Sequence, residues 1–254
     1  MLLSELFDQL TFGELSQIYV AGRDEIGIQA ADYEKIIPHI NLGLTELHKR
    51  FEIKTNTLTI QQDPSIEVYH LNSRYALAND GITPEPKYIL DSVGNPFIDD
   101  VLKIIEIKDS YNNTLTLNDD HNYKDISSTG DLVYVPTLGK NDVPVVRTIY
   151  TPTPLSLKST YSSTNMLWTV KYRANHKKLS TYDLDLSSEQ IDISPSFLQP
   201  LLYFIAARIF ESMSEQDGTM YYQKYENACH LLASSNSLID YTSTNNKLDE
   251  RGFI

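Results

Sequence analysis

The fold is decided by the stretch Asp32-Tyr-Glu-Lys-Ile-Ile-Pro-His-Ile-Asn-Leu-Gly-Leu-Thr-Glu-Leu-His-Lys-Arg-Phe51. Its apolar residues recur at helical spacing, which predicts one amphipathic helix with a continuous stripe of Ile36, Ile37, Ile40, Leu44, Leu47 and Phe51. Asp32 stands where an N-cap acceptor belongs, and Pro38 lies far enough inside the helix to predict a kink or an irregular turn. A stripe of this length needs a partner element to cover it.

The partner is expected near the other end of the chain. Ser194 is a good N-cap and Pro195 a favoured first helical residue, and apolar residues then continue at helical spacing to Met213. After Gly218 the pattern predicts a last helix from Thr219 to about Leu232 or beyond. Because each helical segment has an apolar face to cover, the two ends of the chain are expected to pack on one another.

Between these ends the apolar period changes to alternation. Short strand-like runs rich in β-branched residues alternate with turn-forming residues: 52–60, 66–69, 102–108, 114–117, 132–135, 145–150 and 167–172. The Pro-containing stretch 151–154 is expected to be a stiff connector at an edge, and residues 71–100 an extended loop or arm.

The sequence therefore predicts an α+β fold. An antiparallel helical bundle is built from the N- and C-terminal segments, and a β-sandwich or barrel-like domain is inserted between them. The expected divisions are an N-terminal half of the bundle, the β insertion, a C-terminal half of the bundle and a flexible tail, at residues 1–54, 55–192, 193–235 and 236–254.

The charge balance restricts the partners. The chain has 254 residues and a formal net charge of −13, which argues against a protein that grips nucleic acid, because phosphate binding requires clustered Lys and Arg. Its 17 tyrosines fit partly buried contacts between proteins, and equally an ordinary sheet surface. The sequence shows neither a signal peptide nor a membrane-length apolar run, so we expect synthesis in a cytoplasm and no membrane partner.

The motif search favours a protein without catalysis. The sequence contains neither a His-Glu-x-x-His motif nor a Gly-rich phosphate loop, and the single cysteine, Cys229, is expected to pack in a core. The run Asp119-Asp-His121 is interpreted as a solvated turn. We therefore expect no catalytic residue, no cofactor and no metal site.

One basic cluster, residues 171–178, stands out in this acidic chain. It is interpreted as an inter-subunit salt-bridge patch, with contact to a phosphate backbone as the alternative. The candidate interface residues are Lys171, Tyr172, Arg173, His176 and Lys177.

Three segments together resemble a known family: Ile36-Ile-Pro-His-Ile-Asn-Leu-Gly-Leu-Thr-Glu-Leu-His-Lys-Arg-Phe51, Val170-Lys-Tyr-Arg-Ala-Asn-His176 and Ile193-Ser-Pro-Ser-Phe-Leu-Gln-Pro-Leu-Leu-Tyr-Phe-Ile-Ala-Ala-Arg208. In order and hydrophobic pattern they are similar to tailed-phage head-to-tail adaptor proteins, also called connector, head-completion or tail tubular A-like proteins. Residues 61–165 match no member of that family.

The resemblance implies a homo-oligomeric ring in the virion, typically dodecameric, docked beneath the portal protein. The β-rich part of each subunit would meet the next tail or nozzle protein, and DNA would pass through the lumen without sequence-specific binding. The family's C-terminal segments often reach toward the portal, which makes Tyr241, Leu248, Phe253 and Ile254 candidate docking residues.

Two other functions are open at this point. The β insertion could serve a tail-associated binding module, such as an adhesin or carbohydrate-binding component, and this reading requires an aromatic-lined pocket. A tail-associated hydrolase requires two carboxylates or a pair of histidines that converge in a cleft.

Overall fold

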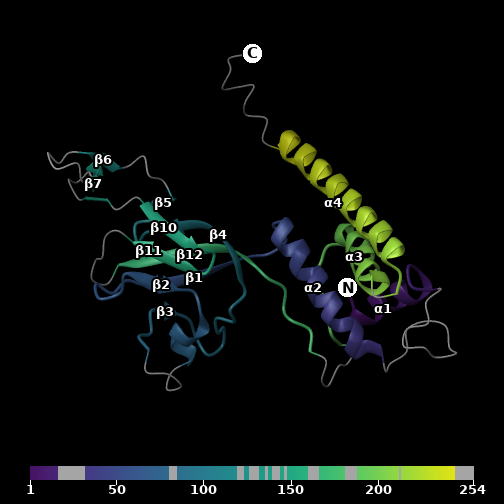
Figure 1. Cartoon of the computed structure of the whole chain (residues 1–254). Helices are drawn as coiled ribbons and strands as arrows, with labels where there is room; N and C mark the ends of the chain where they lie inside the picture. The colour runs from purple at the N-terminus through teal and green to yellow at the C-terminus, as the bar shows by residue number, and fades with distance from the viewer. Residues whose placement is uncertain are drawn as a thin grey trace, which may run out of the picture. The chain divides into compact units, whose positions relative to one another are not determined.

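A computed structural model describes the chain at residues 1–16, 32–79, 85–118, 123–125, 132–134, 137–138, 144–145, 148–159, 166–180, 188–211 and 213–243. It divides into two compact units, a helical unit of residues Met1–Leu47 with Lys178–Ile254 and a β unit of residues His48–Lys177 (Figure 1). Both boundaries fall earlier in the chain than the expected ones after residues 54 and 192. The returning segment from Lys178 therefore belongs to the helical unit.

The helices follow the apolar periods of the sequence. They are α1 (Leu3–Phe12), α2 (Tyr33–Arg50), the 3-10 turn η5 (Pro195–Phe197), α3 (Leu198–Glu211) and α4 (Glu215–Ser243). Helix α2 begins directly after the buried Asp32, runs through Pro38 and contains the predicted stripe. The N-terminal helix α2 packs together with α3 and α4, so the predicted association of the two chain ends is confirmed.

The helical unit is held together by tight packing and by hydrogen bonds between segments that are distant in sequence. Ile36, Ile37 and Ile40 are almost completely buried, and Gly43 lets α2 approach α3 at Leu201. The Asn41 side chain accepts a hydrogen bond from the backbone N–H of Leu179 (2.9 Å) and donates one to its carbonyl (3.0 Å). This pair of bonds fixes the returning segment to α2.

Helix α4 is longer than expected. The sequence predicts a helix from Thr219 to about Leu232 or beyond and a flexible tail from residue 236, but α4 begins at Glu215, includes Gly218 and continues to Ser243. The Ser-Ser-Asn-Ser run that follows Leu232 and Ala233 has modest helix propensity, yet the helix continues through it for about three further turns. None of the described helices is long and apolar enough to cross a membrane.

The β unit is built on an eight-stranded sheet. Its strands are β1 (Thr55–Gln61), β2 (Val68–His70), β3 (Ile89–Leu90), β4 (Val101–Lys108), β5 (Thr114–Leu117), β10 (Thr148–Thr153), β11 (Ser156–Ser159) and β12 (Leu167–Ala174). Their order is β2-β11-β10-β5-β4-β12-β1-β3, with every pair antiparallel except β10 with β5. Two small hairpins pair β6 (Tyr123–Asp125) with β7 (Leu132–Tyr134) and β8 (Thr137–Leu138) with β9 (Pro144–Val145).

One face of this sheet forms the core of the β unit. Alternate residues of β12, beginning with Trp168 and Val170, point into a cluster that also contains Ile60, Tyr69 and Ile107. Strands β2 and β3 remain the two edges, so the described strands do not close into a barrel. The predicted β insertion is confirmed, and a closed barrel is not formed.

The expectation for Thr151-Pro-Thr-Pro154 was wrong. Residues up to Thr153 belong to β10, which lies between β11 and β5. Pro152 is tolerated there because the register with β11 passes from Tyr150 directly to Thr153, and a bulge takes up the missing N–H donor.

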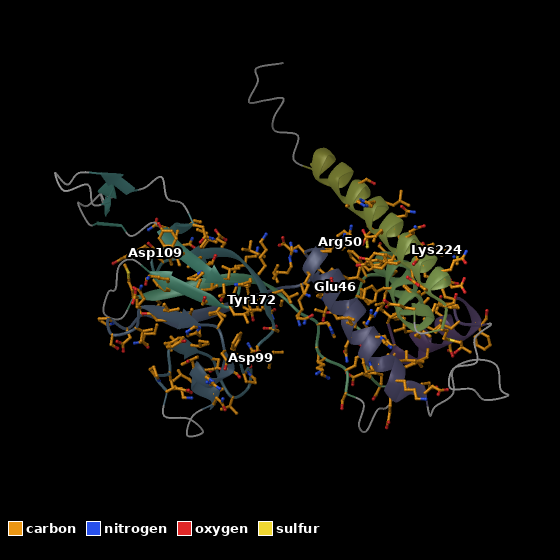
Figure 2. The ribbon with its side chains drawn as sticks, in the orientation of Figure 1. Glu46, Arg50, Asp99, Asp109, Tyr172 and Lys224 are labelled. Atoms are coloured by element: carbon orange, nitrogen blue, oxygen red, sulfur yellow. The ribbon has the colours of Figure 1, made fainter. Side chains whose placement is uncertain are left out.

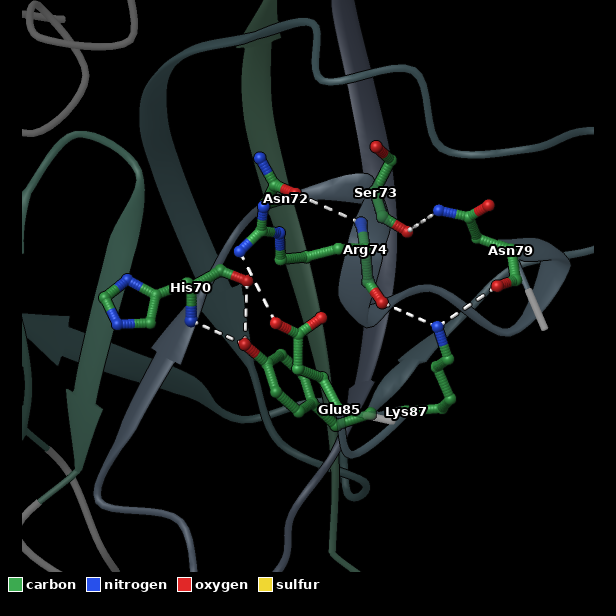
Figure 3. Close-up of polar contacts among 8 residues, drawn as sticks. His70, Asn72, Ser73, Arg74, Asn79, Glu85 and Lys87 are labelled. Carbon is green, nitrogen blue, oxygen red and sulfur yellow. Dashed lines mark hydrogen bonds and ion pairs between the residues drawn. The ribbon is translucent and has the colours of Figure 1, made fainter. Parts of the chain in front are cut away.

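The segment 71–100, expected to be an extended arm, is folded onto the β unit where it is described. It forms the 3-10 turns η2 (Ser73–Tyr75) and η3 (Leu77–Asn79) and then β3. Figure 3 shows how side chains hold it: Lys87 Nζ donates to the carbonyls of Arg74 (2.6 Å) and Asn79 (3.1 Å). Side-chain donors thus satisfy backbone acceptors that no strand pairs, which hydrophobic alternation cannot reveal.

Candidate interaction surfaces

The predicted interface residues lie on β12 and the segment that follows it. Lys171 and Arg173 point to the outer face of the strand, whereas Tyr172 points inward and is only 3% exposed. The Tyr172 hydroxyl donates to Asp100 Oδ1 (2.8 Å), and both residues belong to the β unit (Figure 2 labels Tyr172). Tyr172 therefore stabilises the β unit from within and contributes no surface to a partner.

Asp100 ties three strands together. Its Oδ2 accepts from Asn56 Nδ2 (2.9 Å) on β1, and its carbonyl accepts from the N–H of Asn175 (2.7 Å) after β12. Burial raises the pKa of Tyr172 above its ordinary value, and the hydrogen bond to Asp100 raises it further. The phenol thus stays a proton donor to the carboxylate across the physiological pH range.

Asp100 and Tyr172 line a cavity of about 690 Å³ beside β1 and β3. The second carboxylate in this cavity, Asp91, accepts hydrogen bonds from the N–H groups of Ala78 (2.7 Å) and Phe97 (2.8 Å). Both acids of the cavity thus already serve as hydrogen-bond acceptors that hold the fold.

The outer face of β12 carries two cations with different surroundings. Lys171 lies opposite Glu106 of β4, a complementary pair. Arg173 lies opposite Lys103 of the same strand, and its Nη1 donates to the carbonyl of Lys49 in the last turn of α2. Sequence reasoning found Arg173 and missed Lys103 and Lys49, because Lys103 meets Arg173 only through the strand register and Lys49 only through the end of α2.

His176 and Lys177 follow β12. The His176 ring lies 5.8 Å from the ring of the buried His48, measured between centroids, and its Nδ1 is 2.8 Å from the Lys177 carbonyl. The Lys177 side chain is exposed. These two histidines are the only pair of histidine rings in contact among the described residues, and the described residues contain no group of three or more potential ligands for a metal ion.

The helical unit exposes several large apolar side chains. They lie on α4 and in the turn that precedes it: Met213 (59% exposed), Met220 (44%), Tyr222 (51%) and Leu231 (71%). Leu231 borders a groove of about 500 Å³ between α3 and α4, where Lys224 Nζ lies 4.4 Å from the centre of the Tyr221 ring (Lys224 is labelled in Figure 2). Exposed apolar side chains next to an amphipathic groove are typical of a protein contact surface.

The remaining candidates have different outcomes. Tyr241 lies in the last turn of α4, whereas Leu248, Phe253 and Ile254 lie outside the described residues, as do Asp119, Asp120 and His121. Cys229 is completely buried, which confirms its predicted place in a core. On the helical unit, burial lowers the pKa of His39, and the nearby Arg208 lowers it further.

The aromatic residues of the β unit also bear on the binding-module alternative. Tyr69, Tyr88 and Trp168 contact one another edge to face, with centroids 5.1 and 5.3 Å apart, and all three are buried. They form part of the core, whereas the cavity beside β1 and β3 is lined by Phe97 and Tyr172 among aliphatic and polar residues. These three buried rings therefore offer no free face for stacking on a sugar ring.

Comparison of the sequence with models of known protein families and with curated proteins gives no match.

Proposed function

We propose that this protein is a structural virion subunit, an adaptor in a ring beneath the portal that joins a phage head to its tail and lets DNA pass. The observation that carries the proposal is the way the two chain ends fold together. Helix α2 packs with α3 and α4, and the β unit is spliced between them. The resemblance of residues 36–51, 170–176 and 193–208 to head-to-tail adaptor proteins implies this arrangement of elements.

In this proposal the helical unit is an antiparallel bundle that keeps each subunit rigid within the ring. The β unit is a sandwich-like or barrel-like head that meets the next tail protein. Each contact between neighbours in a ring is heterologous, so every subunit needs two different surfaces that complement each other. The exposed apolar residues of α4 support one such surface, and the cations of β12 and of the segment after it support another.

The remaining parts of the proposal follow from charge and chain position. A subunit with a net charge of −13 suits a lumen through which DNA slides without being gripped. The C-terminal residues Tyr241, Leu248, Phe253 and Ile254 are proposed to dock on the portal, and the ring to be dodecameric. The role is mechanical, and we propose neither a catalytic step nor a cofactor.

The test is electron microscopy of the purified protein mixed with the portal protein of the same virus. We expect an added ring of density on the portal for the native chain. Leu231→Glu should prevent ring formation, because a charge at this exposed apolar position opposes burial in an interface without disturbing the core.

The matched control is Val93→Glu, which changes an even more exposed apolar residue (88%) on the β unit and should still allow the ring to form. A native chain that is correctly folded and yet adds no ring to the portal would refute the adaptor function.

A further inference from the structure

The outer face of the β unit contains a pocket in which cations gather. The pocket has a volume of about 640 Å³ and lies beside β4, β5, β10 and the last turn of α2. Lys49, Lys103 and Arg173 contribute its three charges, and no carboxylate belongs to its lining. In a chain with a net charge of −13, such a local excess of positive charge requires an explanation.

The strand register makes the charge excess sharper. Lys103 and Arg173 are directly opposite each other on the antiparallel strands β4 and β12. Like charges in this position repel, whereas the neighbouring cation Lys171 faces Glu106, and Lys108 forms an ion pair with the same Glu106 at 3.6 Å. Among the charged residues that face each other on these two strands, only Lys103 and Arg173 have no described carboxylate to neutralise their charge.

Arg173 is held in a geometry suited to an oxyanion. Its Nη1 donates to the Lys49 carbonyl, which fixes the plane of the guanidinium. Its Nε is buried and makes no hydrogen bond with any described residue. A buried donor without a partner is costly, and the guanidinium fork matches the two oxygens of a carboxylate or a phosphate.

The rest of the lining indicates which oxyanion enters. The pocket has an apolar floor that includes Ile104, Ile105 and Leu117, and Pro152 and Pro154 stand at its side. Such a floor accommodates an aliphatic side chain next to the charged group, and the volume is in the range of ordinary ligand pockets. A nucleic-acid backbone would instead need an extended basic stripe, which three cations on an acidic chain do not provide.

We propose that this pocket binds an acidic peptide segment of a protein partner, with a carboxylate side chain between Arg173 and Lys103 and an apolar side chain on the floor. The inference depends on the pocket and not on the ring, because a monomer in solution would bind the same segment.

The test uses the full-length protein and follows the Nε–Hε resonance of Arg173 by NMR, assigned by its loss in Arg173→Lys. The probe is a short blocked peptide with two glutamates and one leucine. We expect a saturable shift of this resonance, and Lys103→Gln should weaken binding by about tenfold, the effect of losing one charge-assisted hydrogen bond. Lys108→Gln, on the same strand and outside the pocket lining, is the matched control and should leave the affinity unchanged.

Thermal unfolding without peptide gives an independent readout. Because the Lys103–Arg173 pair repels in the empty pocket, Lys103→Gln should raise the midpoint, whereas a purely structural lysine would lower it on removal. A lowered midpoint, an equal loss of affinity in Lys103→Gln and Lys108→Gln, or the lack of a peptide-induced shift would overturn the proposal. Equal or tighter binding of inorganic phosphate or duplex DNA at the same resonance would overturn the assignment to a peptide.

Discussion

At the scale of single residues, Gly43 shows how one position sets the distance between two helices. A Cβ atom at this position would lie 2.8 Å from Leu201 Cδ1 and 2.9 Å from Phe204 Cδ1, closer than packed carbon atoms can approach. Leu201 is fully buried, so its side chain has little room to move away. Glycine within α2 is therefore required by the close contact with α3, although it weakens the helix itself.

We predict that Gly43→Ala lowers the free energy of unfolding by about 1–2 kcal/mol, because overpacking outweighs the gain in helix propensity. Denaturant unfolding monitored by circular dichroism measures the change. Phe204→Leu in the same chain should recover part of the loss by making room for the new methyl group. The control is Gly94→Ala, where nothing lies within 4 Å and the stability should stay nearly constant. A stabilised Gly43→Ala variant would show that α2 and α3 are further apart than described.

At the scale of elements, strands and helices with strong periodicity could be predicted from the sequence. The stripe of α2, the apolar positions of α3 and the alternation in β12 each form one apolar face, and the structure buries those faces. A 3-10 turn begins at Pro195 as the capping signal suggests, but the Ser194 side chain makes no capping hydrogen bond. Two other predictions were wrong. The polar run after Leu232 does not end α4, because the helix continues through it. Pro152 does not exclude a strand, because a bulge in β10 accommodates the proline.

The candidate surfaces were less accessible to sequence reasoning. Arg173 was found because basic residues cluster along the chain, but Lys49 and Lys103 are distant in sequence and meet it only through strand register and the end of α2. Tyr172 belongs to the same cluster in sequence and yet points inward, because neighbouring residues on a strand face opposite sides. The register of a strand, and which of its residues point into the core, depend on the strands it pairs with. A single sequence does not show which strands pair.

The folded segment 71–100 is a third case, because it depends on specific polar contacts. The Tyr88 hydroxyl accepts a hydrogen bond from the N–H of His70 (2.7 Å) and donates one to its carbonyl (2.9 Å). His70 is the last residue of the edge strand β2, and Tyr88 directly precedes the other edge strand, β3. The Tyr88 side chain therefore links the two edges of the sheet. Burial raises the pKa of Tyr88 well above its ordinary value, which keeps the hydroxyl protonated as the donor.

We predict that Tyr88→Phe lowers the free energy of unfolding by about 1–3 kcal/mol, because it leaves the His70 N–H and carbonyl without their partner while the ring remains. Hydrogen exchange should show faster exchange of the His70 amide. Tyr111→Phe is the control, because the Tyr111 side chain is 76% exposed and no described hydrogen bond involves its hydroxyl. Equal stability of the two variants would mean that the link between the sheet edges does not contribute to folding.

At the scale of the whole molecule, the β unit is inserted into the helical unit at one place in the chain. Within the β unit, the two ends lie close together: His48 and His176 are in ring contact, and the Ala174 N–H donates to the Lys54 carbonyl (2.9 Å). Within the helical unit, the Asn41–Leu179 hydrogen bonds hold the corresponding ends in the same way. Each unit is therefore closed on itself and has its own core.

We predict that residues 48–177 fold when expressed alone, and that the helical unit folds when this segment is replaced by a short Gly/Ser linker from Leu47 to Lys178. The two chain ends of each unit lie close together, so joining or freeing them costs little loop-closure entropy. Each unit alone should therefore retain cooperative thermal unfolding. NMR spectra of the separate β unit should show dispersed amide resonances that match a subset of the full-length spectrum. The control is a β fragment that begins at Thr55, which lacks the Lys54 carbonyl and the His48 contact and should be less stable. An isolated 48–177 fragment with collapsed, undispersed resonances would mean that the β unit needs the helical unit in order to fold.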